Sequence, residues 1–147
     1  MKKKITYLID VLGDKYIGLK FDQYEIENYI TKFENYCDDN DIDYPTLKDN
    51  REKRDGSFFH TTFLSVSEYH KVIESGDMLI DKEIKIKILG IGCATKNNSV
   101  TYFLILKSDS LQTYRNKLGF KNKDLHITLG FDTDDIFGVD KGINSLI

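Results

Sequence analysis

Residues 124–131 read DLHITLGF and place a histidine and a threonine two positions apart in a run with the composition of a buried strand. Side chains alternate between the two faces of a strand, so residues i and i+2 point the same way. The apolar odd-numbered positions from 125 to 131 are therefore expected on the core face. His126 and Thr128 are expected on the other face, with Gly130 beside them leaving space for a ligand. The run predicts a strand that presents an imidazole and a hydroxyl together.

The same arrangement occurs a second time, in residues 57–64, which read SFFHTTFL. Here Phe59, Thr61 and Phe63 are predicted to face the core, and His60 and Thr62 to project from the opposite face. One His-x-Thr in a strand is a weak signal, but two of the three histidines in the chain fall in it. The third histidine, His70, has no such partner and is interpreted as an ordinary surface or boundary residue. The repeat, rather than either copy alone, indicates a function.

The length and composition indicate a single compact domain. The chain has 147 residues, of which 40% are hydrophobic, enough for one core and too few for two independent domains. We expect one domain over residues 1–147, built as two lobes of about 1–66 and 67–147 with strand exchange allowed between them. No apolar run reaches eighteen residues, and the start MKKK is not followed by a cleavage site, so we expect a cytoplasmic protein that does not contact a membrane.

Each half of the chain repeats the order strand, helix, His-x-Thr strand. In the first half, a capping box at Asp22 and Glu25 opens an amphipathic helix whose apolar stripe runs to Cys37, and residues 40–56 form a long polar loop. A second capping box, at Ser65 and Glu68, opens a short helix. The expected elements of the second half are a hairpin of 83–88 with 100–106, and a helix capped at Ser108 or Ser110 that carries Arg115 and Lys117 in its last turn and stops at Gly119.

Two facing histidines suit the cleavage of a phosphodiester. The reaction needs a base to activate the attacking oxygen and an acid to protonate the leaving oxygen, and neutral and protonated imidazole serve these roles near pH 7. The threonine hydroxyls can hold the non-bridging phosphate oxygens. The histidines lack the close spacing of a metal site, and Cys37 and Cys93 are expected to be buried thiols. We therefore expect no metal and no other cofactor.

The motifs HTTF (60–63) and HITL (126–129) resemble the paired His-x-Thr motifs of the two-histidine (2H) phosphoesterase superfamily. The run LHITLGFDTDDIFGVDK (125–141) is similar to the Swiss Army Knife and 2′-5′ RNA ligase-like branch. The resemblance implies an α+β bilobal fold, in which two antiparallel sheets line a central groove with helices packed outside. It carries catalytic roles to His60, Thr62, His126 and Thr128. Matching residues for substrate binding are not identified, and Tyr16, Phe137 and Lys141 are candidates only.

The expected function is that of a metal-independent phosphodiesterase acting on a short or cyclic oligonucleotide or on a 2′,3′-cyclic phosphate. The superfamily includes enzymes that process RNA ends and phage anti-CBASS enzymes that cut cyclic oligonucleotide signals. An RNA-end processing or ligase-like enzyme, or a non-catalytic nucleotide- or RNA-binding module, stays an alternative. The oligomeric state is left open.

A compact substrate is expected in preference to a long RNA, because the net charge is −3 and basic runs are confined to 2–4 and 48–54. Four cations of the polar loop are expected to close over that polyanion: Lys48, Arg51, Lys53 and Arg54.

Overall fold

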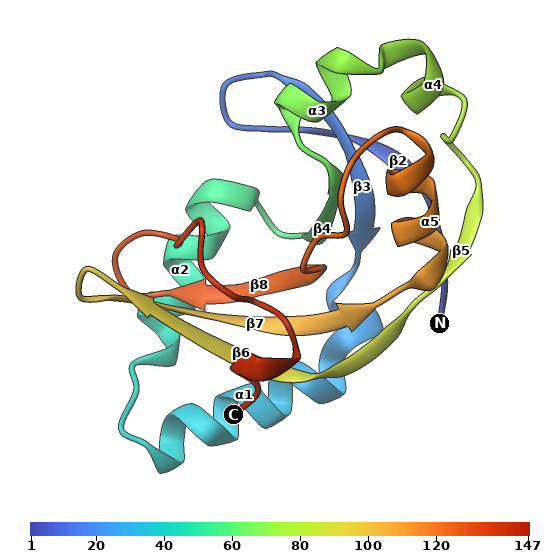
Figure 1. The fold of residues 1–147 in the computed structure, drawn as a ribbon. Coiled ribbons are helices and arrows are strands. Elements are labelled where there is room, and N and C mark those ends of the chain that lie inside the picture. The colour runs from blue at the N-terminus through green and yellow to red at the C-terminus, as the bar shows by residue number, and fades with distance from the viewer.

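Two three-stranded antiparallel sheets, each carrying one histidine motif, form the centre of the structure, a computed structural model that describes residues 1–147 (Figure 1). The first sheet has the order β2-β3-β4 and consists of β2 (Thr6–Ile9), β3 (Lys15–Phe21) and β4 (Phe59–Leu64). The second has the order β6-β7-β8 and consists of β6 (Lys87–Lys96), β7 (Ser99–Lys107) and β8 (His126–Phe131). A third, two-stranded sheet pairs β1 (Lys2–Lys4) with β5 (Glu83–Lys85). The expected α+β fold with antiparallel sheets is confirmed.

The helices begin where their capping residues predict. The Asp22–Glu25 capping box precedes η1 (Gln23–Ile26) and α1 (Glu27–Asp39), and the Ser65–Glu68 box opens α3 (Val66–Lys71), which α4 (Ile73–Asp77) follows. Ser108 caps α5 (Asp109–Lys117), because its hydroxyl accepts the N–H of Leu111. The short η2 (Ile143–Ser145) lies near the C-terminus.

The predicted hairpin is present as β6 and β7, but one of its strands is placed differently. Asn97 and Asn98 join the strands with φ of 50° and 63°, the left-handed conformation that two-residue hairpin turns require. The expected strand over 83–88 is divided: Glu83–Lys85 pairs with β1, and only the residues from Lys87 onward pair with β7. The alternation of the sequence shows strand character but not the partner, which is chosen by long-range pairing.

Residues 40–56 are not the polar loop that the sequence suggested, because most of them form α2 (Tyr44–Asp55). Asp43 caps this helix by accepting the N–H of Thr46, and Pro45 lies in its first turn, where its missing N–H costs nothing. Only Leu47 and Arg51 of the helix are buried. A stripe of two residues is too thin to give the periodic apolar signal of a packed helix.

Both histidine strands contain an irregularity directly after the threonine. The pairing of β3 with β4 skips Phe63, and the pairing of β7 with β8 skips Leu129. The unpaired residue of a β-bulge interrupts the alternation of side chains, so the residue after it projects from the same face as the unpaired residue. Gly130 therefore lies on the core face, where a Cβ would come within 2.8 Å of the backbone of Leu47 in α2. The expectation that Gly130 leaves space for a ligand is wrong, because that space holds the helix.

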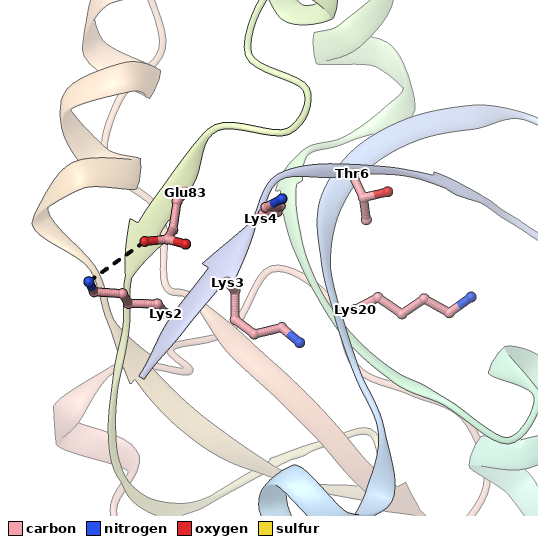
Figure 2. Close-up of a pocket in the computed structure, with 6 residues that line it drawn as sticks. All are labelled: Lys2, Lys3, Lys4, Thr6, Lys20 and Glu83. Carbon is pink, nitrogen blue, oxygen red and sulfur yellow. Dashed lines mark ion pairs between the residues drawn. The ribbon is translucent and has the colours of Figure 1, made fainter.

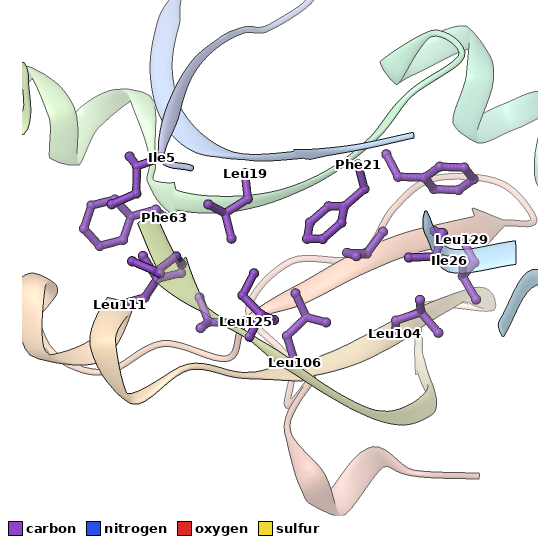
Figure 3. Close-up of a cluster of buried hydrophobic side chains, with 14 of the residues drawn as sticks. Ile5, Leu19, Phe21, Ile26, Phe63, Leu104, Leu106, Leu111, Leu125 and Leu129 are labelled. Carbon is purple, nitrogen blue, oxygen red and sulfur yellow. The ribbon is translucent and has the colours of Figure 1, made fainter. Parts of the chain in front are cut away.

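A continuous cluster of 23 buried residues joins the two sheets. Figure 3 shows side chains of β3 and β4 meeting those of β7 and β8 across this core. The helices pack across the halves of the chain: Phe33 of α1 contacts Tyr102 of β7 at 5.1 Å between ring centroids, whereas Arg115 of α5 donates to the carbonyl of Phe63 in β4 at 2.7 Å. Arg115 also binds the carboxylate of Glu68. Arg115 lies in the last turn of α5 as expected, and its side chain is buried between α5, α3 and β4.

Candidate active site

The two motif strands, β4 and β8, lie against each other although they belong to different sheets (Figure 1). His60, Thr62 and His126 are half-buried, and Thr128 is buried. Their faces are the ones expected, since the alternate residues Thr61 and Ile127 are buried on the core side. The hydroxyl of Thr61 is itself buried without a hydrogen-bond partner.

His60 lies beside a carboxylate. Its Nδ1 is 3.8 Å from Oδ2 of Asp55, the last residue of α2. The rings of Tyr16 and Phe58 approach it edge-on, with centroids at 6.1 and 6.5 Å. Burial lowers the pKa of His60, and the charge of Asp55 opposes that shift. A carboxylate at this position favours the protonated imidazole.

His126 has a different environment. Its Nδ1 lies 3.1 Å from the carbonyl oxygen of Asp124, and Phe103 packs edge-on at 5.7 Å. A carbonyl only accepts, so Nδ1 carries the proton in the neutral ring and Nε2 has a free lone pair. Burial and the nearby charge of Lys141 lower the pKa of His126 to about 4. The imidazole of His126 is therefore neutral at pH 7 and can accept a proton at Nε2.

A chain of charged groups connects the surroundings of the two histidines. Arg54 donates to both carboxylate oxygens of Asp55, at 2.8 and 2.7 Å, and forms an ion pair with Asp135. Asp135 in turn lies 3.5 Å from the hydroxyl of Thr128 and 3.4 Å from Nζ of Lys141. Burial disfavours ionisation of Asp135, but the cations outweigh it and lower its pKa to about 2. The network therefore stays charged throughout the neutral range.

The candidate binding residues Tyr16, Phe137 and Lys141 all lie around these groups. Burial raises the pKa of Tyr16 to about 12, so its phenol is neutral beside His60. Lys141 is only 5% exposed, and its ammonium lies between the rings of Phe103 and Phe137, at 5.8 and 5.5 Å from their centroids. Phe137 is 73% exposed at the surface.

Asp55 and Asp135 are site residues that the sequence did not predict. Asp135 had a signal, because it opens the run DIFGV that follows the second motif. Of the cations expected over the substrate, Arg54 is in the network, but Arg51 is 2% exposed and donates to the carbonyl of Phe58 at 3.2 Å. Lys48 pairs with Glu52 at 3.8 Å on the helix surface. A helix, unlike a loop, directs these side chains to different sides.

A model of the Swiss Army Knife 2H phosphoesterase domain matches residues 25–137, which include both motifs and Asp135. The chain belongs to the Swiss Army Knife family of 2H phosphoesterases. Membership of this family implies that the protein is a hydrolase of phosphodiester bonds. Comparison with curated proteins and with solved structures gave no match. None of its helices has the length and apolar character needed to cross a bilayer.

Proposed function

We propose that this 2H phosphoesterase cleaves a short or cyclic oligonucleotide, or a 2′,3′-cyclic phosphate, with His60 and His126 as a general acid–base pair. The observation that supports this most directly is the contrast between the two rings. His126 is fixed with Nε2 unprotonated by its bond to the Asp124 carbonyl, and His60 has the carboxylate of Asp55 beside it. Burial lowers the pKa of both rings, to about 4 for His126, and the Asp55 carboxylate opposes that shift at His60. A difference between the two pKa values lets one ring act as base while the other acts as acid.

The chemistry follows from these states. Nε2 of His126 removes a proton from the attacking water, whose oxygen forms a new bond to phosphorus. As the bond between phosphorus and the leaving ribose oxygen breaks, the His60 imidazolium gives its proton to that oxygen. The substrate phosphate is negative, so its arrival raises the pKa of His60 and favours the acid form. The proton removed and the proton delivered balance, and one turnover leaves the two rings with exchanged protonation states, which bulk water resets.

Hydrogen-bond donors and positive charge stabilise the phosphorane-like transition state. We assign the non-bridging oxygens to the hydroxyls of Thr62 and Thr128, because both project beside the two rings on the same strand faces. Thr128 would exchange its 3.5 Å hydrogen bond to Asp135 for one to the phosphate. Lys141 and Arg54 bring positive charge close to the Thr128 side of the site. Such preorganised charge acts at low local dielectric and is worth more there than in water.

The experiment is a product assay with three kinds of substrate: 2′,3′-cyclic mononucleotides, RNA that ends in a cyclic phosphate, and cyclic di- and trinucleotides. Products are separated by chromatography with and without EDTA, and His60→Ala and His126→Ala are the controls. We expect turnover that EDTA does not reduce and that both variants lack. Loss of activity on chelation, restored by zinc or manganese, would overturn the two-histidine mechanism. Binding of all substrates without turnover would instead indicate a nucleotide-binding module. A higher kcat/KM for cyclic di- and trinucleotides would favour cleavage of cyclic oligonucleotides, and a higher kcat/KM for RNA that ends in a cyclic phosphate would favour RNA-end processing.

A further inference from the structure

A hollow of about 370 Å³ lies between the two-stranded sheet of β1 and β5 and the strands β2 and β3 of the first sheet, and none of its lining residues is apolar. Figure 2 shows its lining side chains, four lysines with one threonine and one glutamate. They are Lys2, Lys3, Lys4, Thr6, Lys20 and Glu83. A site with this lining has nothing to offer an apolar ligand and suits an anion.

Two of these lysines have free charges. Lys3 donates to both carboxylate oxygens of Glu25, at 3.0 and 2.9 Å, and Lys2 lies 3.7 Å from Glu83. Lys4 and Lys20 are exposed and have no carboxylate within ion-pair distance, although the Lys20 ammonium rests 4.1 Å from the ring centroid of Phe58. Two unpaired ammonium groups around one hollow are suited to bind a phosphate.

Strand register connects this hollow to the proposed active site. Lys20 of β3 is paired directly with His60 of β4, so both side chains project from the same face of the sheet. One row further along, Thr6, Gly18 and Thr62 stand opposite one another across β2, β3 and β4. Neighbouring strands are about 4.8 Å apart, so Thr6 lies about 10 Å from Thr62. A chain with its reacting phosphate at His60 can therefore reach the hollow with a neighbouring phosphate.

The positive charge continues beyond the hollow. A second hollow of about 540 Å³ shares Lys2 and adds Lys85, Lys87 and Lys107, with Asp109 as its one acidic residue. The register places Lys2 directly opposite Lys85, and Lys87 directly opposite Lys107. Like charges in directly opposed positions destabilise a sheet. Two such pairs, in a chain whose net charge is −3, are explained if a polyanion covers them.

We propose that six lysines form a binding site for the phosphates of a single-stranded oligonucleotide whose reacting phosphate lies between the two motifs. These residues, called the lysine band below, are Lys2, Lys4, Lys20, Lys85, Lys87 and Lys107. The proposal rests on the proposed function and deepens it, because it assigns to the site a substrate with several phosphates. It reverses the preference for a compact ligand that the net charge suggested. A bilayer surface fits less well, since membrane-bound segments insert apolar side chains, whereas the first hollow has none and the second has only Met1 and Ile86.

The experiment compares a uridine decamer ending in a 2′,3′-cyclic phosphate with the 2′,3′-cyclic mononucleotide, which has no further phosphate. The test variant is Lys4→Gln/Lys20→Gln, and the matched control is Lys32→Gln/Lys117→Gln, which removes two exposed lysines from α1 and α5. We expect the ratio of kcat/KM for decamer over mononucleotide to fall on the order of tenfold in the test variant only. Equal losses on both substrates, or a ratio that matches the control, would overturn the proposal.

A binding measurement separates this proposal from the proposed function. Fluorescence anisotropy of a labelled decamer is followed over a salt series with the His60→Ala/His126→Ala variant, with and without the two lysine changes. Loss of two phosphate contacts should make the salt slope shallower by about 1.4. If no substrate is turned over but this slope change appears, the catalytic proposal fails and the lysine band stands. Lysine-dependent binding to phosphatidylserine vesicles, with none to the decamer, would overturn the band as a nucleic-acid site.

Discussion

At the scale of single residues, the two histidines differ more in their polar neighbours than in their exposure. His126 is bonded to a carbonyl, whereas His60 faces a carboxylate across 3.8 Å. The motif letters are the same in both strands, so the difference comes entirely from the neighbours. Asp124 and Asp55 precede their histidines by two and five positions. Both contacts are therefore local in sequence, but the two spacings differ, so they do not form a shared motif.

The first prediction concerns cooperation between the rings. His60→Ala and His126→Ala should each remove most turnover, and the double variant should be little worse than either single one, because members of one catalytic unit are not additive. kcat/KM of the four proteins is compared, with His70→Ala as the control that keeps activity. Mild losses that multiply in the double variant would assign binding roles to the histidines.

The second prediction concerns pH. The proposed base His126 must be neutral, which requires a pH above about 4, and the proposed acid His60 must be protonated, which requires a pH below its pKa, itself lowered from 6.5. The profile of kcat/KM in the free enzyme should therefore be a bell with its maximum between about 4 and 6.5. Asp55→Asn should move the alkaline limb to lower pH, since it removes the charge that favours the acid form. A maximum above pH 7.5 would exclude this assignment of roles.

At the scale of helices and strands, α5 of the second half of the chain is bound to β4 and α3 of the first half. Arg115 of α5 donates to the carbonyls of Phe63 and Lys121 and to the Glu68 carboxylate, all from a side chain that is 4% exposed. Burial disfavours ionisation of Glu68, but the hydrogen bonds from Arg115 and from the Ser65 N–H, together with the charges of Arg115 and Lys123, outweigh it and lower its pKa to about 2. Glu68 also completes the capping box of α3 by accepting the N–H of Ser65. One carboxylate therefore both caps α3 and binds Arg115 of α5.

Arg115→Ala should therefore lower the free energy of unfolding by about 3–5 kcal/mol, because it leaves Glu68 without its partner and two carbonyls without a donor. Urea unfolding followed by circular dichroism measures the change. Lys117→Ala, two residues away on the exposed side of α5, should alter stability by less than about 0.5 kcal/mol. A similar small effect for both variants would show that Arg115 is not a structural tie.

The sequence predicted the elements that have a strong local signal. The alternation around both motifs, the two capping boxes and the Asn-containing hairpin turn all lie where they were expected. The helix α2 was missed because its buried side is only two residues wide, and Gly130 was assigned to the wrong face because a bulge at Leu129 depends on how β7 pairs with it. The charged network was missed for a related reason: Arg54 and Asp135 meet only after the sheets have come together.

At the scale of the whole molecule, the ionised carboxylates make stability depend on acid. The folded-state pKa values of Asp135 and Glu68 are both lowered to about 2. Their contribution is complete above the unfolded values near 4 and is lost as the pH falls from about 4.5 to 2. The urea midpoint should fall steeply over that interval and change little from these groups between pH 5 and 7. Glu68→Gln should make the fall shallower, and an unchanged slope in that variant would assign the acid sensitivity elsewhere.

The pairing of β1 with β5 has a consequence for synthesis on the ribosome. Lys2–Lys4 leave the exit tunnel well before their hydrogen-bonding partner, Glu83–Lys85, has been synthesised, because β2 to α4 separate the two strands in sequence. Until then, the N-terminal lysines extend from a nascent chain whose apolar residues Ile5, Leu19 and Phe21 lack their later neighbours from β7 and α5. The nascent protein is therefore exposed to chaperones and proteases until Glu83–Lys85 have been made, and rare codons placed between residues 4 and 83 should lengthen that exposure more than rare codons placed after residue 85.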